Sequence, residues 1–188
     1  MPRRHPIAPE APDESVAERL ERVDLSARRE ANLAFADVEL DGCNLANLDA
    51  RGGTLRRVLA TTCRMTGLLW TEGSLRDVVL RDCRIDLASF AATTIEQSVF
   101  EGCLLMQTDF QEARLRAVRF VDCDLSGADL SGARFERCEL RGCTLDGIRA
   151  AERLRGVAMP WDDILASAAT FADAIGVSVL DDGPDAPQ

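Results

Sequence analysis

The stretch CDLSGADLSGARF, residues 123–135, repeats one five-residue pattern without a break. A large apolar residue, such as Leu125 or Phe135, occupies every fifth position, and the residue two places before it is small. Between positions 25 and 150, 25 of the 26 residues whose numbers divide by five are apolar, and Glu30 is the exception. A period of five fits neither an α-helix nor a β-strand. It predicts a solenoid of short repeats that stack on one another.

The cysteines supply a second period, of 20 residues. This period predicts four five-residue units per coil, so that the chain turns four corners and returns above itself. Stacked coils lie about 4.8 Å apart, like paired strands, which gives a rod about 30 Å long. We expect the first coil to be irregular or to start late, because Arg28 and Glu30 break the pattern together. The six cysteines in this period are Cys43, Cys63, Cys83, Cys103, Cys123 and Cys143.

The stretch at 123–135 resembles the A(D/N)LXX motif of the pentapeptide repeat family, and the resemblance covers about residues 23–155. It implies an all-β solenoid, a right-handed quadrilateral β-helix, with the large and the small residue inside and the other three positions outside. The register never slips between residues 25 and 150. In this respect the chain is similar to the loop-less bacterial subgroup that includes quinolone-resistance proteins.

The chain divides into three segments by pattern. Residues 1–22 read as a Pro-rich tail with a short cap helix over 13–22, and residues 23–155 read as the β-helix. Residues 156–188 read as a helix between Pro160 and Gly176, a short strand over 177–180 and an acidic, disordered tail.

The C-terminal helix has two interpretations. A solenoid must cover its open ends, so the helix is expected as a cap. The resemblance implies a dimer interface instead, since members of the subgroup dimerise through C-terminal helices. A large aromatic beside the apolar face favours the dimer. The candidate dimer residues are Trp161, Ile164, Leu165, Ala168, Phe171 and Ile175.

Composition argues against an enzyme. The only histidine is His5, there is no tyrosine or lysine, and no Gly-rich phosphate loop, Cys-x-x-Cys pair or nucleophile elbow is present. We therefore predict no catalytic, cofactor-binding or metal site. The chain has no membrane-length apolar run and no signal peptide. Its seven cysteines have solenoid rather than disulfide spacing, which predicts reduced thiols in a cytoplasmic protein.

Two core features have a second interpretation. The cysteine ladder resembles a soft-metal site, but small apolar filling of a narrow core explains it better. Trp70 would suit a ligand platform, but its position at an apolar centre predicts a core residue, with Gly67 and Gly73 giving it room.

Outward charges differ among the four faces. The face around Leu55, Leu75 and Leu115 has a net charge of +5, whereas the other three have −2 or −3. Its interpretations are a solvated face with partial ion pairing, or a docking face for an acidic partner or for the chain's own acidic tail. The candidate basic residues are Arg56, Arg57, Arg76, Arg114, Arg116, Arg134 and Arg137.

Two further sets are candidates for binding a partner. Leu59, Val79 and Val99 should form an apolar column, which cross-strand stacking explains without a partner and which a binding site would also show. The candidate acidic residues are Glu72, Asp82, Glu101, Asp109, Glu112, Asp122, Asp129 and Glu139.

The resemblance implies a DNA mimic that binds and modulates a type II topoisomerase, DNA gyrase, with a link to quinolone or toxin resistance. The mimicry would be partial, because a 30 Å length of duplex carries about 18 charges and the predicted coil nets −3. The alternative is a general interaction or scaffold module with an unknown protein partner. Contiguous acidity on one side would favour the mimic. Neither interpretation involves direct nucleic-acid or membrane binding.

Overall fold

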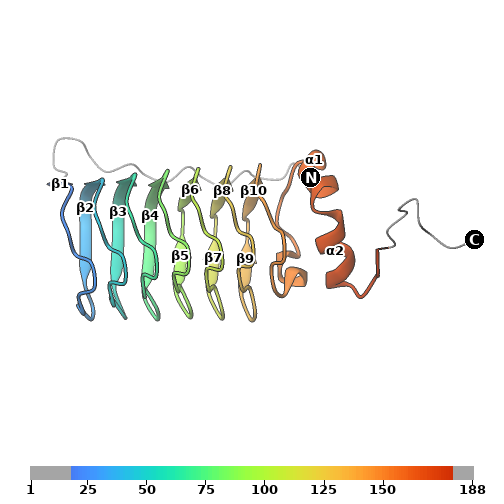
Figure 1. The fold of residues 1–188 in the computed structure, drawn as a ribbon, viewed down its shortest axis with the longest axis horizontal. Helices are drawn as coiled ribbons and strands as arrows, with labels where there is room; N and C mark the ends of the chain where they lie inside the picture. The colour runs from blue at the N-terminus through green and yellow to red at the C-terminus, as the bar shows by residue number, and fades with distance from the viewer. Residues whose placement is uncertain (1–17, 180–188) are drawn as a thin grey trace, which may run out of the picture.

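Each strand of the protein pairs in parallel with a strand 20 residues further along the chain. Leu40 lies beside Ala60, Ala60 beside Leu80, and Leu80 beside Phe100. The computed structural model describes residues 18–179, and in it the coils stack into one parallel β-solenoid with helices at its C-terminal end (Figure 1). The five- and 20-residue periods of the sequence therefore predicted the fold class correctly.

The strands are long at the N-terminal end and short at the C-terminal end. Three eight-residue strands each cover two sides of a coil, and pairs of three-residue strands cover the same two sides in later coils. The strands are β1 Glu18–Glu21, β2 Ala34–Asp41, β3 Thr54–Thr61, β4 Ser74–Arg81, β5 Thr94–Glu96, β6 Val99–Glu101, β7 Arg114–Arg116, β8 Arg119–Val121, β9 Arg134–Glu136 and β10 Glu139–Arg141. The helices are η1 Ala151–Leu154, α1 Trp161–Ala166 and α2 Ala168–Ala174.

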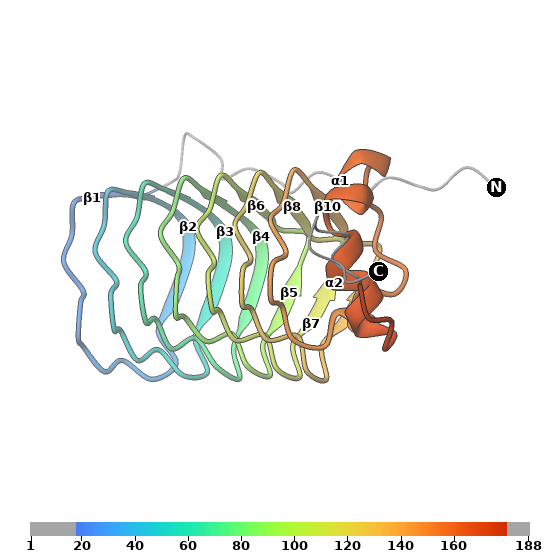
Figure 2. The same ribbon diagram turned by 45° about the vertical axis from the view of Figure 1, so that its right-hand side comes forward.

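The chain turns a corner two residues after each apolar centre. In one coil Asn47, Gly52, Arg57 and Thr62 all have positive φ, between 50° and 71°. Asparagine and glycine adopt this left-handed conformation at low cost, and other residues adopt it at a cost of about 1–2 kcal/mol. Four corners per coil give the solenoid its quadrilateral section, visible in Figure 2.

We name the four faces by one buried centre each. In the order in which the chain follows them, they are the Leu45, Trp70, Leu75 and Phe100 faces. The Leu45 face is therefore opposite the Leu75 face, and the Trp70 face is opposite the Phe100 face.

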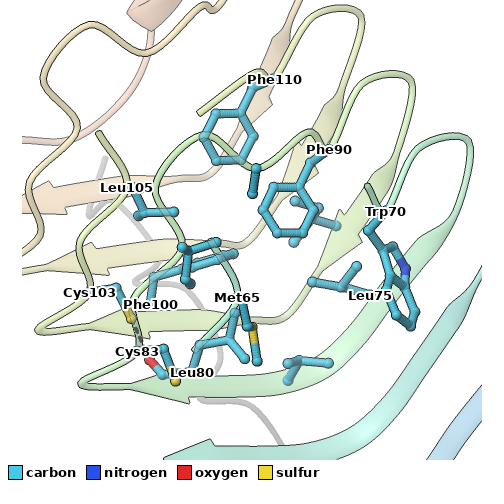
Figure 3. Packing of buried hydrophobic residues seen from close by; sticks show 14 of the residues in the cluster. Met65, Trp70, Leu75, Leu80, Cys83, Phe90, Phe100, Cys103, Leu105 and Phe110 are labelled. Atoms are coloured by element: carbon cyan, nitrogen blue, oxygen red, sulfur yellow. Dashed lines mark hydrogen bonds between the residues drawn. The ribbon is translucent and has the colours of Figure 1, made fainter. Parts of the chain in front are cut away.

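Aromatic rings fill the middle of the core (Figure 3). Phe90 stacks on Phe110 with ring centroids 5.6 Å apart, and Phe100 stacks on Phe120 at 4.8 Å. Rings of the two stacks meet edge to face at 6.2–6.4 Å. All four are almost fully buried. Burial of each such side chain stabilises the fold by roughly 1.5–3 kcal/mol.

The cysteine ladder lies inside the solenoid as small core residues. Each thiol points at a carbonyl 23 residues earlier, as Cys63 does toward Leu40 (3.4 Å) and Cys103 toward Leu80 (3.3 Å). All seven cysteines are free and only Cys143 is partly exposed. Burial raises the pKa of the Cys138 thiol. Within residues 18–179 no group of three or more His, Cys, Asp or Glu residues could hold a metal ion.

The N-terminal end differs from the prediction. Residues 18–21, expected to be helical, form β1, in which Leu20 pairs with Leu40. Leu20 is in phase with the five-residue period and packs against the core, so the solenoid extends back to it. The first coil is also regular, because backbone pairing does not require apolar side chains and Arg28 and Glu30 simply face solvent. The Pro-rich tail, His5 and the rest of the predicted helix lie outside the described residues.

The C-terminal segment also differs. Two helices, α1 and α2, replace the single one expected, with a break at the buried Ser167. Gly176 ends α2 with φ +78°, as predicted. No strand forms over 177–179, where Val177 instead donates its N–H to the carbonyl of Ala172 (2.8 Å). Leu180 and the acidic tail lie outside the described residues. No helix within 18–179 is long and apolar enough to span a membrane.

Candidate protein-binding surfaces

Outward side chains of the solenoid form straight rows. Residues of equal position in successive coils are in register, so a row advances about 4.8 Å per coil. The chemistry of each face is therefore set by which residues recur at a 20-residue interval.

The eight candidate acidic residues lie on two opposite faces, so the structure does not bring them into one contiguous surface. Four belong to the Trp70 face and four to the Phe100 face. They are Glu72, Asp109, Glu112 and Asp129 on the former, and Asp82, Glu101, Asp122 and Glu139 on the latter.

Asp129 is a structural residue rather than a free one. It is 5% exposed, and its carboxylate accepts bonds from Arg149 and Gln111, both at 2.8 Å. Burial acts to raise the pKa of Asp129, but hydrogen bonds from Ser131 and the charge of Arg149 outweigh it, so the pKa lies below its usual value.

Three more of the eight have partners. Glu101 pairs with Arg81 at 2.9 Å, and Glu139 pairs with Arg141 at 2.7 Å. Asp109 accepts hydrogen bonds from a serine hydroxyl and a backbone N–H. These carboxylates are already engaged within the protein, which makes them poor candidates for a partner.

The remaining four carboxylates are exposed and have no ion pair or side-chain hydrogen bond within residues 18–179. All of them occupy corner positions with φ between 51° and 57°. They form two rows on diagonally opposite corners, in which acids alternate with glycine or alanine, so neighbouring acids in a row are two coils or about 9.6 Å apart. We call Glu72, Glu112, Asp82 and Asp122 the corner acids.

The seven candidate basic residues all lie on the Leu75 face, and most are paired. Asp37 binds Arg57 through both carboxylate oxygens and lies 3.7 Å from Arg56. The guanidinium of Arg57 holds the pKa of Asp37 below its usual value. Arg76 and Arg116 share Glu96, at 3.9 and 3.7 Å. The first half of this face is thus largely neutralised.

Arg114 and Arg134 are different. They are neighbours in register on β7 and β9, both are exposed, and within residues 18–179 neither has an ion pair. Arg137, beside them, pairs with Glu136 at 3.5 Å. The sequence did not distinguish these two arginines from the other five, because the distinction depends on which acids lie beside them.

The apolar residues on the outside fall into two groups. Leu59, Val79 and Val99 are in register on the Phe100 face, and they are only partly exposed or buried. Leu87 and Leu104, which sequence reasoning overlooked, are 56% and 40% exposed. Their outward positions in the five-residue pattern could have identified them.

The C-terminal segment covers the last coil and also exposes an apolar surface. Phe171 packs against the core, and Asp163 accepts a hydrogen bond from the Gly142 N–H at 2.7 Å. Trp161 is 69% exposed, Leu165 56% and Ile175 76%. Ile164 and Ala168, the other two candidate dimer residues, also face solvent. Cap and exposed surface are therefore two sides of one segment.

Comparisons with known proteins agree on the repeat. Residues 82–149 match the family model described as the pentapeptide repeat region. No curated protein matches the sequence. The solved structure of HetL, a pentapeptide repeat protein involved in heterocyst differentiation regulation in the cyanobacterium Nostoc sp., is similar with a TM-score of 0.42 at 14% identity, over 78% of this chain and 93% of that one.

Two other solved structures are similar at comparable identity. Full-length QnrB1, a plasmid-mediated fluoroquinolone resistance protein, gives a TM-score of 0.33 at 16% identity, over 86% of this chain and 98% of that one. The protein alr5209, a pentapeptide repeat protein from Nostoc, gives 0.30 at 19% identity, over 78% and 88%. With its family match, its unbroken five-residue register and its parallel β-solenoid, the chain belongs to the pentapeptide repeat family.

Proposed function

We propose that this protein is a non-enzymatic, protein-binding β-helix whose partner is a type II topoisomerase, DNA gyrase, bound by partial imitation of DNA. The observation that carries the proposal is the pair of corner rows. Duplex DNA presents its charge along two backbones, and the corner acids present theirs along two separate lines. Their carboxylates are free to meet basic side chains of a partner, unlike those of Asp129 or Glu101.

The imitation is sparse, because a corner row offers one carboxylate per about 9.6 Å whereas a DNA strand offers one phosphate per about 3.4 Å. The overall charge of −10 adds a long-range attraction to a basic groove. Binding in place of DNA would modulate the topoisomerase, and this is the route by which the protein would act in quinolone or toxin resistance.

The proposal includes a homodimer formed through the C-terminal segment. Trp161, Leu165 and Ile175 present an apolar surface at the end of the rod, and large aromatic residues are enriched in protein interfaces. Two copies joined there would double the length of both corner rows. The protein would act in the cytoplasm, where its seven free cysteines remain reduced.

The test is a gyrase supercoiling assay titrated with the purified protein. The main variant is Glu72→Gln/Asp82→Asn/Glu112→Gln/Asp122→Asn. The control is Glu30→Gln/Glu39→Gln/Asp146→Asn/Asp173→Asn, which removes the same charge from unpaired acids off the corner rows. Inhibition that the first variant loses and the control keeps would support the proposal.

Two outcomes would contradict it. Equal loss in both variants would show that only net charge matters. No inhibition by the native protein at a large excess over gyrase would exclude the topoisomerase, leaving a scaffold with another protein partner.

A further inference from the structure

The Leu75 face carries a groove that the proposed function does not use. It lies across β5, β7 and β9, which run side by side in the C-terminal half of the solenoid (Figure 1), and its volume is about 300 Å³. The residues that line it are Thr94, Glu96, Arg114, Leu115, Arg116, Arg134 and Glu136.

Two rows of side chains form the walls of the groove. Thr94, Arg114 and Arg134 are in register in one row. Arg116 stands between Glu96 and Glu136 in the other. Residues two apart on a strand point to the same side, so the rows are about 6.6 Å apart, and successive coils are about 4.8 Å apart.

The charges of the two rows are not balanced in the same way. In one row Glu96 lies 3.7 Å from Arg116, and Glu136 lies 3.5 Å from Arg137 outside the groove. In the other row, Arg114 and Arg134 have no carboxylate within reach among residues 18–179. Like charges directly opposite each other on adjacent strands are unfavourable. The groove therefore presents two adjacent guanidinium groups that an anion from outside would neutralise.

We propose that this groove binds an acidic peptide segment of a partner protein, with neighbouring carboxylates seated on Arg114 and Arg134. The planar guanidinium group matches a carboxylate with two parallel hydrogen bonds, and the Thr94 hydroxyl offers a further donor at the end of the row. This is a second site, on a different surface from the corner rows, and it does not depend on the identity of the partner bound there.

A peptide suits the groove better than a nucleic acid. A phosphate backbone continues beyond the two arginines and would meet Glu96, Glu136 and the acidic neighbouring faces of a protein with net charge −10. A short acidic segment can place two carboxylates in the groove and leave the acidic faces untouched.

The experiment is a fluorescence anisotropy titration of labelled hexaglutamate with the full chain. We expect saturable binding that weakens as salt rises, and about tenfold weaker binding to the Arg114→Gln/Arg134→Gln variant. The matched control is Arg56→Gln/Arg76→Gln, which removes the same charge from the same face and should bind as the native chain does. The first variant should melt no lower than the native protein, because it relieves a like-charge contact.

Three results would overturn the proposal. One is an absence of saturable binding, or equal weakening in both variants. The second is a duplex oligonucleotide that displaces hexaglutamate and loses affinity with Arg114→Gln/Arg134→Gln. The third uses the variant Asp181→Asn/Asp182→Asn/Asp185→Asn. If hexaglutamate binds only to that variant, the chain's own C-terminal segment is the occupant of the groove. None of these results depends on the supercoiling assay.

Discussion

The indole nitrogen of Trp70 donates a hydrogen bond to the carbonyl oxygen of Gly53, 3.1 Å away in the preceding coil. The ring fits because Gly53 and Gly73 stand where other coils carry a larger inward residue. A Cβ on Gly53 would lie 2.6 Å from Cζ2 of the indole, and one on Gly73 would lie 2.9 Å from Cδ1. Trp70 is thus a core residue, as predicted. Gly67, expected to give it room, instead lies against Asn47.

Gly53→Ala should destabilise the protein by about 2 kcal/mol through overpacking. Gly53 does not have a positive φ, so the alanine is unfavourable because of the indole and not because of its backbone. Urea denaturation measures the change. Adding Trp70→Leu should recover part of the loss, and a double variant in which the two effects simply add would show that the residues do not interact.

Phe100→Asp should prevent folding, with a loss of more than about 4 kcal/mol, because it buries a charge among stacked rings. Leu104→Asp is the control, since Leu104 is outward and 40% exposed. Circular dichroism melts of both variants check the prediction. A cooperative, native-like transition in Phe100→Asp would mean that residue 100 is not inside the solenoid.

Trp161→Asp/Leu165→Asp should convert a dimer into a folded monomer, because both side chains are exposed and neither supports the core. Light scattering gives the mass and a thermal melt checks the fold. Phe171→Asp should instead lower the melting temperature, because Phe171 packs against the last coil. A native chain that is already monomeric at high concentration, or a double variant that remains dimeric, would contradict the proposed interface.

Asp129 should make stability depend on acid. Its folded pKa lies below its unfolded value of about 3.9, so its stabilisation is complete above that value and is lost as pH falls through the folded pKa. Asp129→Asn should cost roughly 1–3 kcal/mol at pH 7 and reduce the loss of stability in acid. Thermal melts at pH 7 and in strong acid test this. Glu112→Gln, which removes an unpaired acid from the same face, should melt as the native protein does at neutral pH.

The sequence predicted the core better than the surface. Inward positions follow from a period that every coil must satisfy, so Phe100, Trp70 and the cysteines could be placed without coordinates. The standing of a surface charge depends on its neighbours one coil away, and the same residue type differs between rows. Asp129 is fixed by Arg149, whereas Glu112 is free. The break at Ser167 could not be predicted, because it results from packing against the end of the solenoid.

The 20-residue offset between paired strands means that the chain can gain or lose a whole coil and keep every row intact, changing only its length by about 4.8 Å. Insertion of one five-residue unit has a different effect. It preserves the apolar period, and so the core, but it shifts everything after it by a quarter of a turn. Arg114 and Arg134 would then continue an acidic face, and the N-terminal half of the Leu75 face would run on into different chemistry. In this protein surface identity is a matter of phase, and single repeats can exchange one surface for another without altering the fold.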